Sequence, residues 1–327
     1  MAVHNEEREL LRQTVAALVD KHATPEAVRS AMDSDLGYDP ALWQLLCEQV
    51  GAAALVVPEE FGGAGGQLGD AAVVVEELGK ALVPTPLLGT ILAELALLSA
   101  AEPDAATLEK LAYGQAIGTV IFDGDYAVNG DLVSSPNIDA VVIGSDGTQL
   151  TRWRSFTAEA LCTMDPTRRL GRISATATEP LGDDPGIADY AAILLAAEQV
   201  GAATRCLDLT VDYTKSRVQF GRPIGSFQAL KHRMADLYVA VSTARAVVDD
   251  AIAEPSATSA ALARVVASEA LTNVAAESVQ LHGGIAITWE SDIQLYFKRA
   301  HSSSQLFGTP PQHLDRLQAK VLHSPVG

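Results

Sequence analysis

Two long stretches in the second half of the chain carry mostly apolar residues at alternating spacings of four and three. Because residues three and four apart share one face of an α-helix, each stretch predicts a long helix with an apolar stripe. Two such stripes must be buried against other helices, so residues 187–327 are predicted to form a four-helix bundle. The two sets are Ile193, Ala197, Val200, Thr204, Leu207 and Val211, and Leu230, Met234, Leu237, Val241, Ala244 and Val248.

The first 112 residues also favour helices. Leu10, Leu11, Val15 and Leu18 recur at helical spacing, and Pro25 can open a second helix after the capping residue Thr24. We therefore expect an N-terminal helical domain over residues 1–112.

Residues 113–186 have a different pattern. The runs 119–122, 139–143 and 172–176 are rich in β-branched residues and are separated by the turn pairs 129–130 and 146–147. They predict a small β domain between the two helical regions. The expected fold class is therefore α+β, mostly helical.

The charge balance limits the ligands of such a chain. It has 41 acidic against 23 Lys and Arg residues, a net charge of −18. A protein this acidic repels nucleic-acid phosphates, so we expect no nucleic-acid binding. An anionic ligand must instead be met by a few well-placed arginines or by helix N-termini.

Compartment and membrane contact follow from simpler patterns. Cys47, Cys162 and Cys206 form no CxxC pair, so we expect neither a disulfide framework nor a metal site. The charged start of the chain does not resemble a signal peptide, and no segment has the roughly 20 unbroken apolar residues of a membrane span. A cytoplasmic protein without membrane contact is expected.

Two motifs could bind an anionic ligand. Residues 217–228 read RVQFGRPIGSFQ and lie between two predicted helices. Arginines beside an aromatic ring and an amide can hold a phosphate and stack under a base, although a loop with solvated arginines is the simpler alternative. Residues 280–284 read QLHGG, where paired glycines allow close approach of a phosphate, or merely end a helix around a packed His282.

The order of these motifs resembles the acyl-CoA dehydrogenase family of flavoenzymes. The RxxFGxxI–FQ pattern is followed about fifty residues later by QLHGG, and the resemblance extends over essentially the whole chain. Residues 57–66, VPEEFGGAGG, and residues 165–168, DPTR, agree with it. The α–β–α order of the predicted regions agrees as well.

The resemblance implies an FAD enzyme that removes hydrogens from Cα and Cβ of an acyl-CoA thioester. A carboxylate takes the α proton, the flavin N5 accepts the β hydride, and an electron-transfer flavoprotein receives the electrons. It also implies residues that contact an FAD held mainly by the neighbouring subunit, with Arg217 at the pyrophosphate and Phe220 near the adenosine. The full set is Arg217, Phe220, Gln228, Gln280, Gly283 and Gly284.

The family's own-site residues are missing from this sequence. Residues 119–126 lack the loop that hydrogen-bonds the flavin ring and the thioester, and residues 132–135 replace the Trp-Ile-Thr element beside the ring. Phe307 stands where the catalytic Glu of a Tyr-Glu-Gly-Thr motif belongs, and a phenylalanine cannot accept a proton.

A relocated base has few candidates. The family's other base position aligns with Ala191, which has Asp189 nearby and Glu198 two turns further on. Glu198 is the only carboxylate in the apolar stretch of that helix. It is either a displaced base or, as its apolar neighbours favour, a helix-pairing or buried hydrogen-bonding group.

These departures favour a non-catalytic subunit that acts on the FAD of a full-length homologue in an α2β2 acyl-CoA dehydrogenase. Two different chains would allow a bulky acyl group, and the resemblance to enzymes of bacterial steroid catabolism suggests a sterol-derived one. The alternatives are a self-sufficient homomeric dehydrogenase with a relocated base, and a flavin-free scaffold protein.

Overall fold

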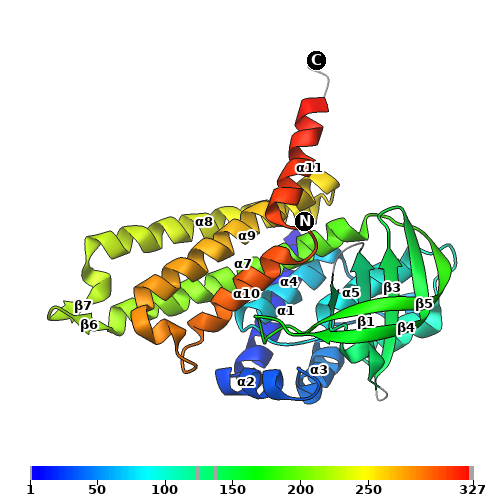
Figure 1. Cartoon of the computed structure of the whole chain (residues 1–327), viewed down its shortest axis with the longest axis horizontal. Helices are drawn as coiled ribbons and strands as arrows, with labels where there is room; N and C mark the ends of the chain where they lie inside the picture. The colour runs from blue at the N-terminus through cyan, green and yellow to red at the C-terminus, as the bar shows by residue number, and fades with distance from the viewer. Residues whose placement is uncertain (1, 123–125, 136–137, 324–327) are drawn as a thin grey trace.

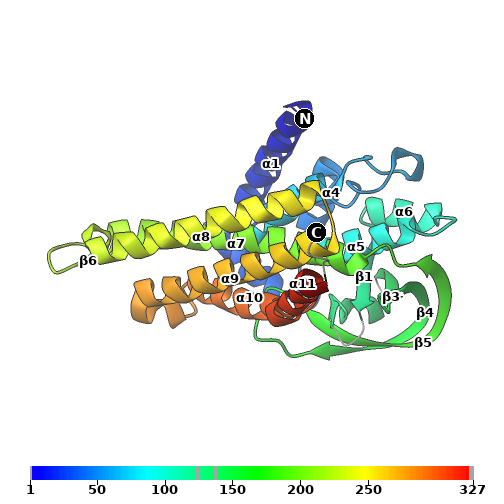
Figure 2. The ribbon, with the colours of Figure 1, turned by 90° about the horizontal axis from the view of Figure 1, so that it is seen from above.

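The computed structural model describes residues 2–122, 126–135 and 138–323 (Figure 1). A small sheet lies at one end of an elongated array of helices, and a short hairpin lies at the opposite end. Both views show this separation (Figures 1 and 2). The expected α+β, mostly helical fold class is confirmed.

The N-terminal region is helical up to Ala112. Thr24 caps the second helix, because its hydroxyl oxygen accepts a hydrogen bond from the backbone N–H of Ala27 at 3.3 Å. The fourth and fifth helices are buried on nearly all sides and form the centre of the molecule. The helices are α1 (Ala2–His22), α2 (Pro25–Asp33), α3 (Pro40–Leu45), α4 (Leu68–Lys80), α5 (Leu87–Leu98) and α6 (Ala105–Ala112).

A five-stranded sheet follows, with the strand order β1-β3-β4-β5-β2. β1 and β3 pair in parallel and the other pairs are antiparallel. The predicted runs 119–122, 139–143 and 172–176 lie in β1, β3 and β5, while part of the stretch 119–126 falls outside the described residues. The strands are β1 (Ala116–Phe122), β2 (Ala127–Val128), β3 (Asp139–Ser145), β4 (Gln149–Leu161) and β5 (Leu170–Asp183).

The second helical region packs directly on the first. Gly201 on α7 lets α4 approach closely, since a Cβ there would lie 2.1 Å from the carbonyl oxygen of Glu76. None of the described helices is long and apolar enough to cross a bilayer. The helices are α7 (Ile187–Ser216), α8 (Gln228–Ala253), α9 (Ala257–His282), α10 (Ile293–Gln305) and α11 (Pro310–His323), and β6 (Val218–Gln219) and β7 (Arg222–Pro223) form the hairpin between α7 and α8.

Glu94 on α5 is a buried acid without a partner. It has no exposed surface, and neither of its carboxylate oxygens has a hydrogen-bond partner among the described residues. Burial raises the pKa of Glu94 well above its ordinary value. The folded chain therefore keeps Glu94 protonated at a pH where the unfolded chain has lost that proton, and its stability falls as the pH rises toward the folded pKa.

Replacing Glu94 with glutamine, which cannot ionise, should stabilise the chain at pH 8 by about 1 to 3 kcal/mol. The two proteins should have nearly equal stability close to pH 4, where the parent carboxyl is neutral in both states. Urea unfolding at the two pH values measures the difference. The same difference at both pH values would contradict the account.

Candidate functional site

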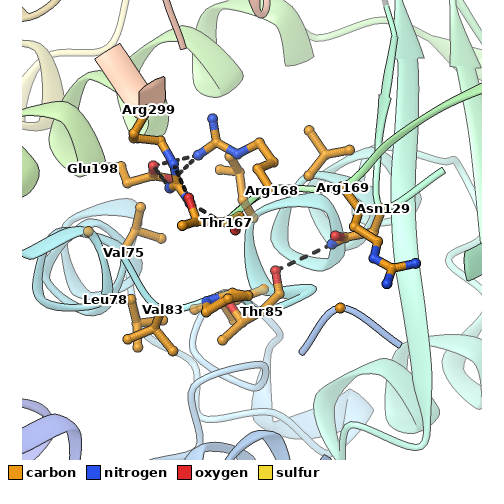
Figure 3. Close-up of a pocket in the computed structure, with 16 residues that line it drawn as sticks. Val75, Leu78, Val83, Thr85, Asn129, Thr167, Arg168, Arg169, Glu198 and Arg299 are labelled. Atoms are coloured by element: carbon orange, nitrogen blue, oxygen red, sulfur yellow. Dashed lines mark hydrogen bonds and ion pairs between the residues drawn. The ribbon is translucent and has the colours of Figure 1, made fainter. Parts of the chain in front are cut away.

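Four buried charged side chains meet where the sheet joins the helices. Asp165 and Arg168 lie in the loop between β4 and β5, Glu198 on α7 and Arg299 on α10. None of them is more than 7% exposed. Figure 3 shows Arg168 and Arg299 converging on Glu198 from two directions.

The four charges are mutually satisfied. Arg299 donates from Nε to Asp165 Oδ2 at 2.8 Å and from Nη1 to Glu198. Arg168 donates to both oxygens of Glu198 and, at 3.0 Å, to the hydroxyl of Ser303. Two acids and two bases leave no net charge, so this ionic cluster joins the β4–β5 loop to α7 and α10.

The ionic cluster also determines the ionisation of Glu198. Burial alone would raise its pKa, but the charges of Arg168 and Arg299 outweigh burial and hold the pKa of Glu198 below its ordinary value. A carboxylate that is ion-paired with two guanidinium groups is a poor proton acceptor. The geometry therefore favours the helix-pairing role for Glu198. Asp189 is also paired, because it accepts a hydrogen bond from Arg316 on α11 at 2.8 Å.

A cavity of about 350 Å³ is lined by Met164, Leu170 and the end of α10. A separate, small cavity of about 30 Å³ lies beside the ionic cluster. Its walls come from α4, the α4–α5 connection and the end of β2, and the Asn129 amide donates to the Thr85 carbonyl oxygen across it at 3.3 Å (Figure 3). Water needs roughly 10–15 Å³ on this measure, whereas ligand pockets are commonly at least about 300 Å³. This small cavity has room for a water molecule, but not for a flavin ring or an acyl chain.

An aromatic pair occupies the position where the sequence resemblance predicts a catalytic base. The ring of Phe307, in the α10–α11 connection, packs edge-on against Phe122 at the end of β1, with centroids 5.5 Å apart. Phe307 is only 6% exposed. Arg264 on α9 fixes the same loop by donating to the Leu306 carbonyl oxygen at 2.8 Å. Phe307 thus makes an apolar contact with the sheet and offers no proton acceptor.

The six residues predicted to bind FAD lie at the other end of the molecule. Phe220 is at the tip of the β6–β7 hairpin, 90% exposed and with a positive φ of 55°, a backbone conformation rare for a phenylalanine. Arg217 and Gln228 flank the hairpin, and both are exposed. Among the described residues, no carboxylate forms an ion pair with the Arg217 guanidinium.

The QLHGG segment ends α9 at the same end of the molecule. A Cβ added to Gly283 or to Gly284 would meet nothing within 4 Å, so both lie beside open space, although the positive φ of Gly283, 65°, itself favours glycine at the end of α9. His282 is a packed histidine, since its ring stacks on Tyr213 at 4.2 Å and its Nδ1 lies 2.8 Å from the Ser278 carbonyl oxygen. The open face beside the two glycines permits close approach of an external group.

Sequence reasoning missed part of this arrangement. It noted Asp165 and Arg168 only as a segment typical of the family, and it did not select Arg299. A single arginine in an amphipathic helix carries no signal that it will be buried, so only the tertiary structure could identify it. The described residues contain no group of three or more His, Cys, Asp or Glu side chains that could hold a metal ion.

The residues at the two ends fit FAD differently. The cavity that the ionic cluster itself lines does not fit it, because about 30 Å³ is too small for a flavin ring. At the hairpin, an exposed guanidinium, an exposed aromatic ring and two open glycines are groups that can hold a dinucleotide. The flavin would supply the hydride acceptor, and these residues could bind and orient it.

The helix–sheet–helix order agrees with the acyl-CoA dehydrogenase-like fold that the sequence resemblance predicts. Residues 5–115 match the family model "Acyl-CoA dehydrogenase, N-terminal domain" and residues 186–322 match "Acyl-CoA dehydrogenase, C-terminal domain". The chain belongs to the acyl-CoA dehydrogenase family. The two matches lie on either side of the sheet, whose truncation the sequence predicts.

Individual relatives agree over the full length of the chain. It is 68% identical over 317 residues to acyl-CoA dehydrogenase IpdE2 of Mycolicibacterium smegmatis, covering 97% of this chain and 99% of the relative. Among solved structures, the Tcur3481–Tcur3483 steroid ACAD has a TM-score of 0.86 at 26% identity, covering 97% and 98% of the two chains. The ChsE4–ChsE5 complex from Mycobacterium tuberculosis has a TM-score of 0.87 at 23% identity, covering 98% of each.

Proposed function

We propose that this chain is the non-catalytic subunit of a heteromeric, FAD-dependent acyl-CoA dehydrogenase. It contributes Arg217, Phe220, Gln228 and the QLHGG segment to an FAD that a full-length homologous subunit holds. The partner supplies the flavin-ring pocket and the catalytic base. The assembly is an α2β2 tetramer with one FAD per heterodimer, and it passes electrons to an electron-transfer flavoprotein.

One observation carries this proposal: the β6–β7 hairpin lies at the opposite end of the molecule from the sheet, and Phe307 packs against strand β1 of that sheet (Figures 1 and 2). The hairpin residues therefore lie away from Phe307, and we infer that they act on the cofactor of a second chain. They are exposed, and Phe220 keeps a positive φ at the hairpin tip. Such a hairpin is suited to contact a second chain.

The filled position around Phe307 supports the same proposal. A homomeric enzyme needs a base and a ring pocket in every chain. Here the base position holds a phenylalanine that packs on Phe122, and the nearby Glu198 is committed to two arginines. These contacts argue against the homomeric alternative with a relocated base.

The substrate class rests on the relatives. A steroid ACAD is among the similar solved structures, and another similar structure is a complex of two named proteins. We extend this to a bulky, sterol-derived acyl-CoA as the substrate of the assembled enzyme. A pocket supplied mainly by one subunit of each pair leaves room for a large acyl group.

Arg217→Ala tests the shared site in the co-expressed complex. We expect its FAD to dissociate with a Kd raised about tenfold, because a charge-assisted hydrogen bond to a phosphate is lost. Arg154→Ala, which removes an exposed arginine on β4, is the matched control and should retain the flavin. Equal flavin retention by both variants would show that Arg217 does not contact the cofactor, and would favour a flavin-free scaffold role.

A further inference from the structure

A much larger cavity lies on the other face of α4. Its volume is about 470 Å³, compared with about 30 Å³ for the cavity beside the ionic cluster. Val75, Leu78 and Gly79 of α4 line the small cavity, whereas Glu77 and Lys80 line the large one. These two sets project from opposite sides of the helix, so α4 separates the cavities.

The walls of the large cavity are about half apolar and come from five segments distant in sequence: α1, α2, the end of α4, α7 and α10. The volume lies in the range of small-molecule pockets, about 300–1,000 Å³. The larger apolar side chains of the lining are Val19, Val28, Leu82, Leu209 and Leu295.

Polar contacts fix the helices that form these walls relative to one another. Arg29 on α2 pairs with Asp292 beside α10 at 2.5 Å and donates to the Trp289 carbonyl oxygen at 3.2 Å. Tyr296 on α10 donates its hydroxyl to the carbonyl oxygen of Lys80. These contacts link different helices. The shape of the cavity is therefore determined by how the helices pack together.

The cavity lining includes two cations, Lys80 and Arg205, that retain free N–H donors. The Lys80 ammonium group forms an ion pair with Glu77, with Nζ 2.6 Å from Oε1, and has two further N–H donors. Arg205 on α7, whose charge acts on the buried Tyr296, has no carboxylate within ion-pair distance among the described residues. The remaining charged lining groups are Asp20 on α1 and Asp208 on α7, both exposed, and the Arg29–Asp292 pair.

We infer that this cavity binds an amphipathic small molecule with an apolar ring or aliphatic body and a single anionic group. The body lies against the apolar walls, and the carboxylate or sulfonate faces Arg205 and Lys80. The site is separate from Phe307 and from the hairpin. The inference therefore goes beyond the proposed dehydrogenase function and does not depend on it.

Two dyes that differ by one sulfonate test the inference on the full-length chain alone. They are 8-anilino-1-naphthalenesulfonate and its neutral relative N-phenyl-1-naphthylamine. We expect both to bind with one dye per chain, as measured by fluorescence titration. Arg205→Ala should weaken the sulfonate about tenfold and leave the neutral dye unchanged. Lys231→Ala, which removes an exposed cation on α8, is the matched control and should change neither.

A cavity-filling substitution locates the dyes. Leu209→Trp should abolish binding of both dyes, and near-UV circular dichroism checks that this variant is folded. If Leu209→Trp does not fold, Ala16→Trp fills the same cavity from α1. Dye binding that persists in a folded filling variant would place the dyes elsewhere and overturn the inference. So would the absence of saturable binding, or an equal loss of both dyes in Arg205→Ala.

Discussion

Replacing Arg299 with methionine should reduce the free energy of unfolding by about 3 to 5 kcal/mol, because it leaves a buried charge uncompensated. Asp165 would lose its ion-pair partner and Glu198 one of two. Urea unfolding of the lone chain measures the loss. The matched control is Glu179→Ala, which removes an exposed pair with Arg154 and should cost less than about 1 kcal/mol.

The same ionic cluster predicts acid sensitivity. Since the pKa of Glu198 is held below its ordinary value, its contribution is present above the unfolded-state pKa and is lost as the pH falls through the folded-state pKa. The parent should therefore lose this stabilisation on acidification, and Arg299→Met should lose less. Equal stabilities of Arg299→Met and Glu179→Ala at neutral pH would show that the ionic cluster does not hold the fold together.

Phe307→Glu puts a carboxylate at the family's usual base position, yet we expect no dehydrogenase activity from the chain alone. The substitution should destabilise the chain by about 3 to 5 kcal/mol, because the Phe122 contact is lost and a charge enters an apolar site. Urea unfolding and an acyl-CoA assay with added FAD measure the two outcomes.

Phe307→Leu separates the two causes of that loss. It keeps the site apolar and should cost only about 1.5 kcal/mol, so the remainder of the loss in Phe307→Glu is due to the charge. If Phe307→Glu instead gave an active lone chain, this chain would bind its own flavin and lack only the base. The proposed division between subunits would then be wrong.

The sequence alone predicted the order of the helical and sheet regions, because long apolar stripes and β-branched runs are local signals. The motifs around Arg217 and Gln280 identified the family for a similar reason, since each is continuous in sequence. What these motifs contact remains a proposal, although the structure shows them exposed and distant from Phe307.

The contacts of the ionic cluster and of Phe307 could not be predicted in the same way. Arg299 and Asp165 are 134 residues apart, and their ion pair depends on how the β4–β5 loop enters between α7 and α10. The sequence gives no indication that Phe307 packs against Phe122, because the two residues are far apart in the chain and no local pattern links them. Their proximity follows only from the docking of the sheet on the helices.

Flavin absorbance per polypeptide, combined with mass from light scattering, tests the central claim most directly. The chain would be measured alone and after co-expression with a full-length homologue. The account predicts a lone chain without flavin and a yellow tetramer with one FAD per two chains after co-expression. One FAD per chain in the lone protein would contradict it, since each chain would then hold a complete flavin site.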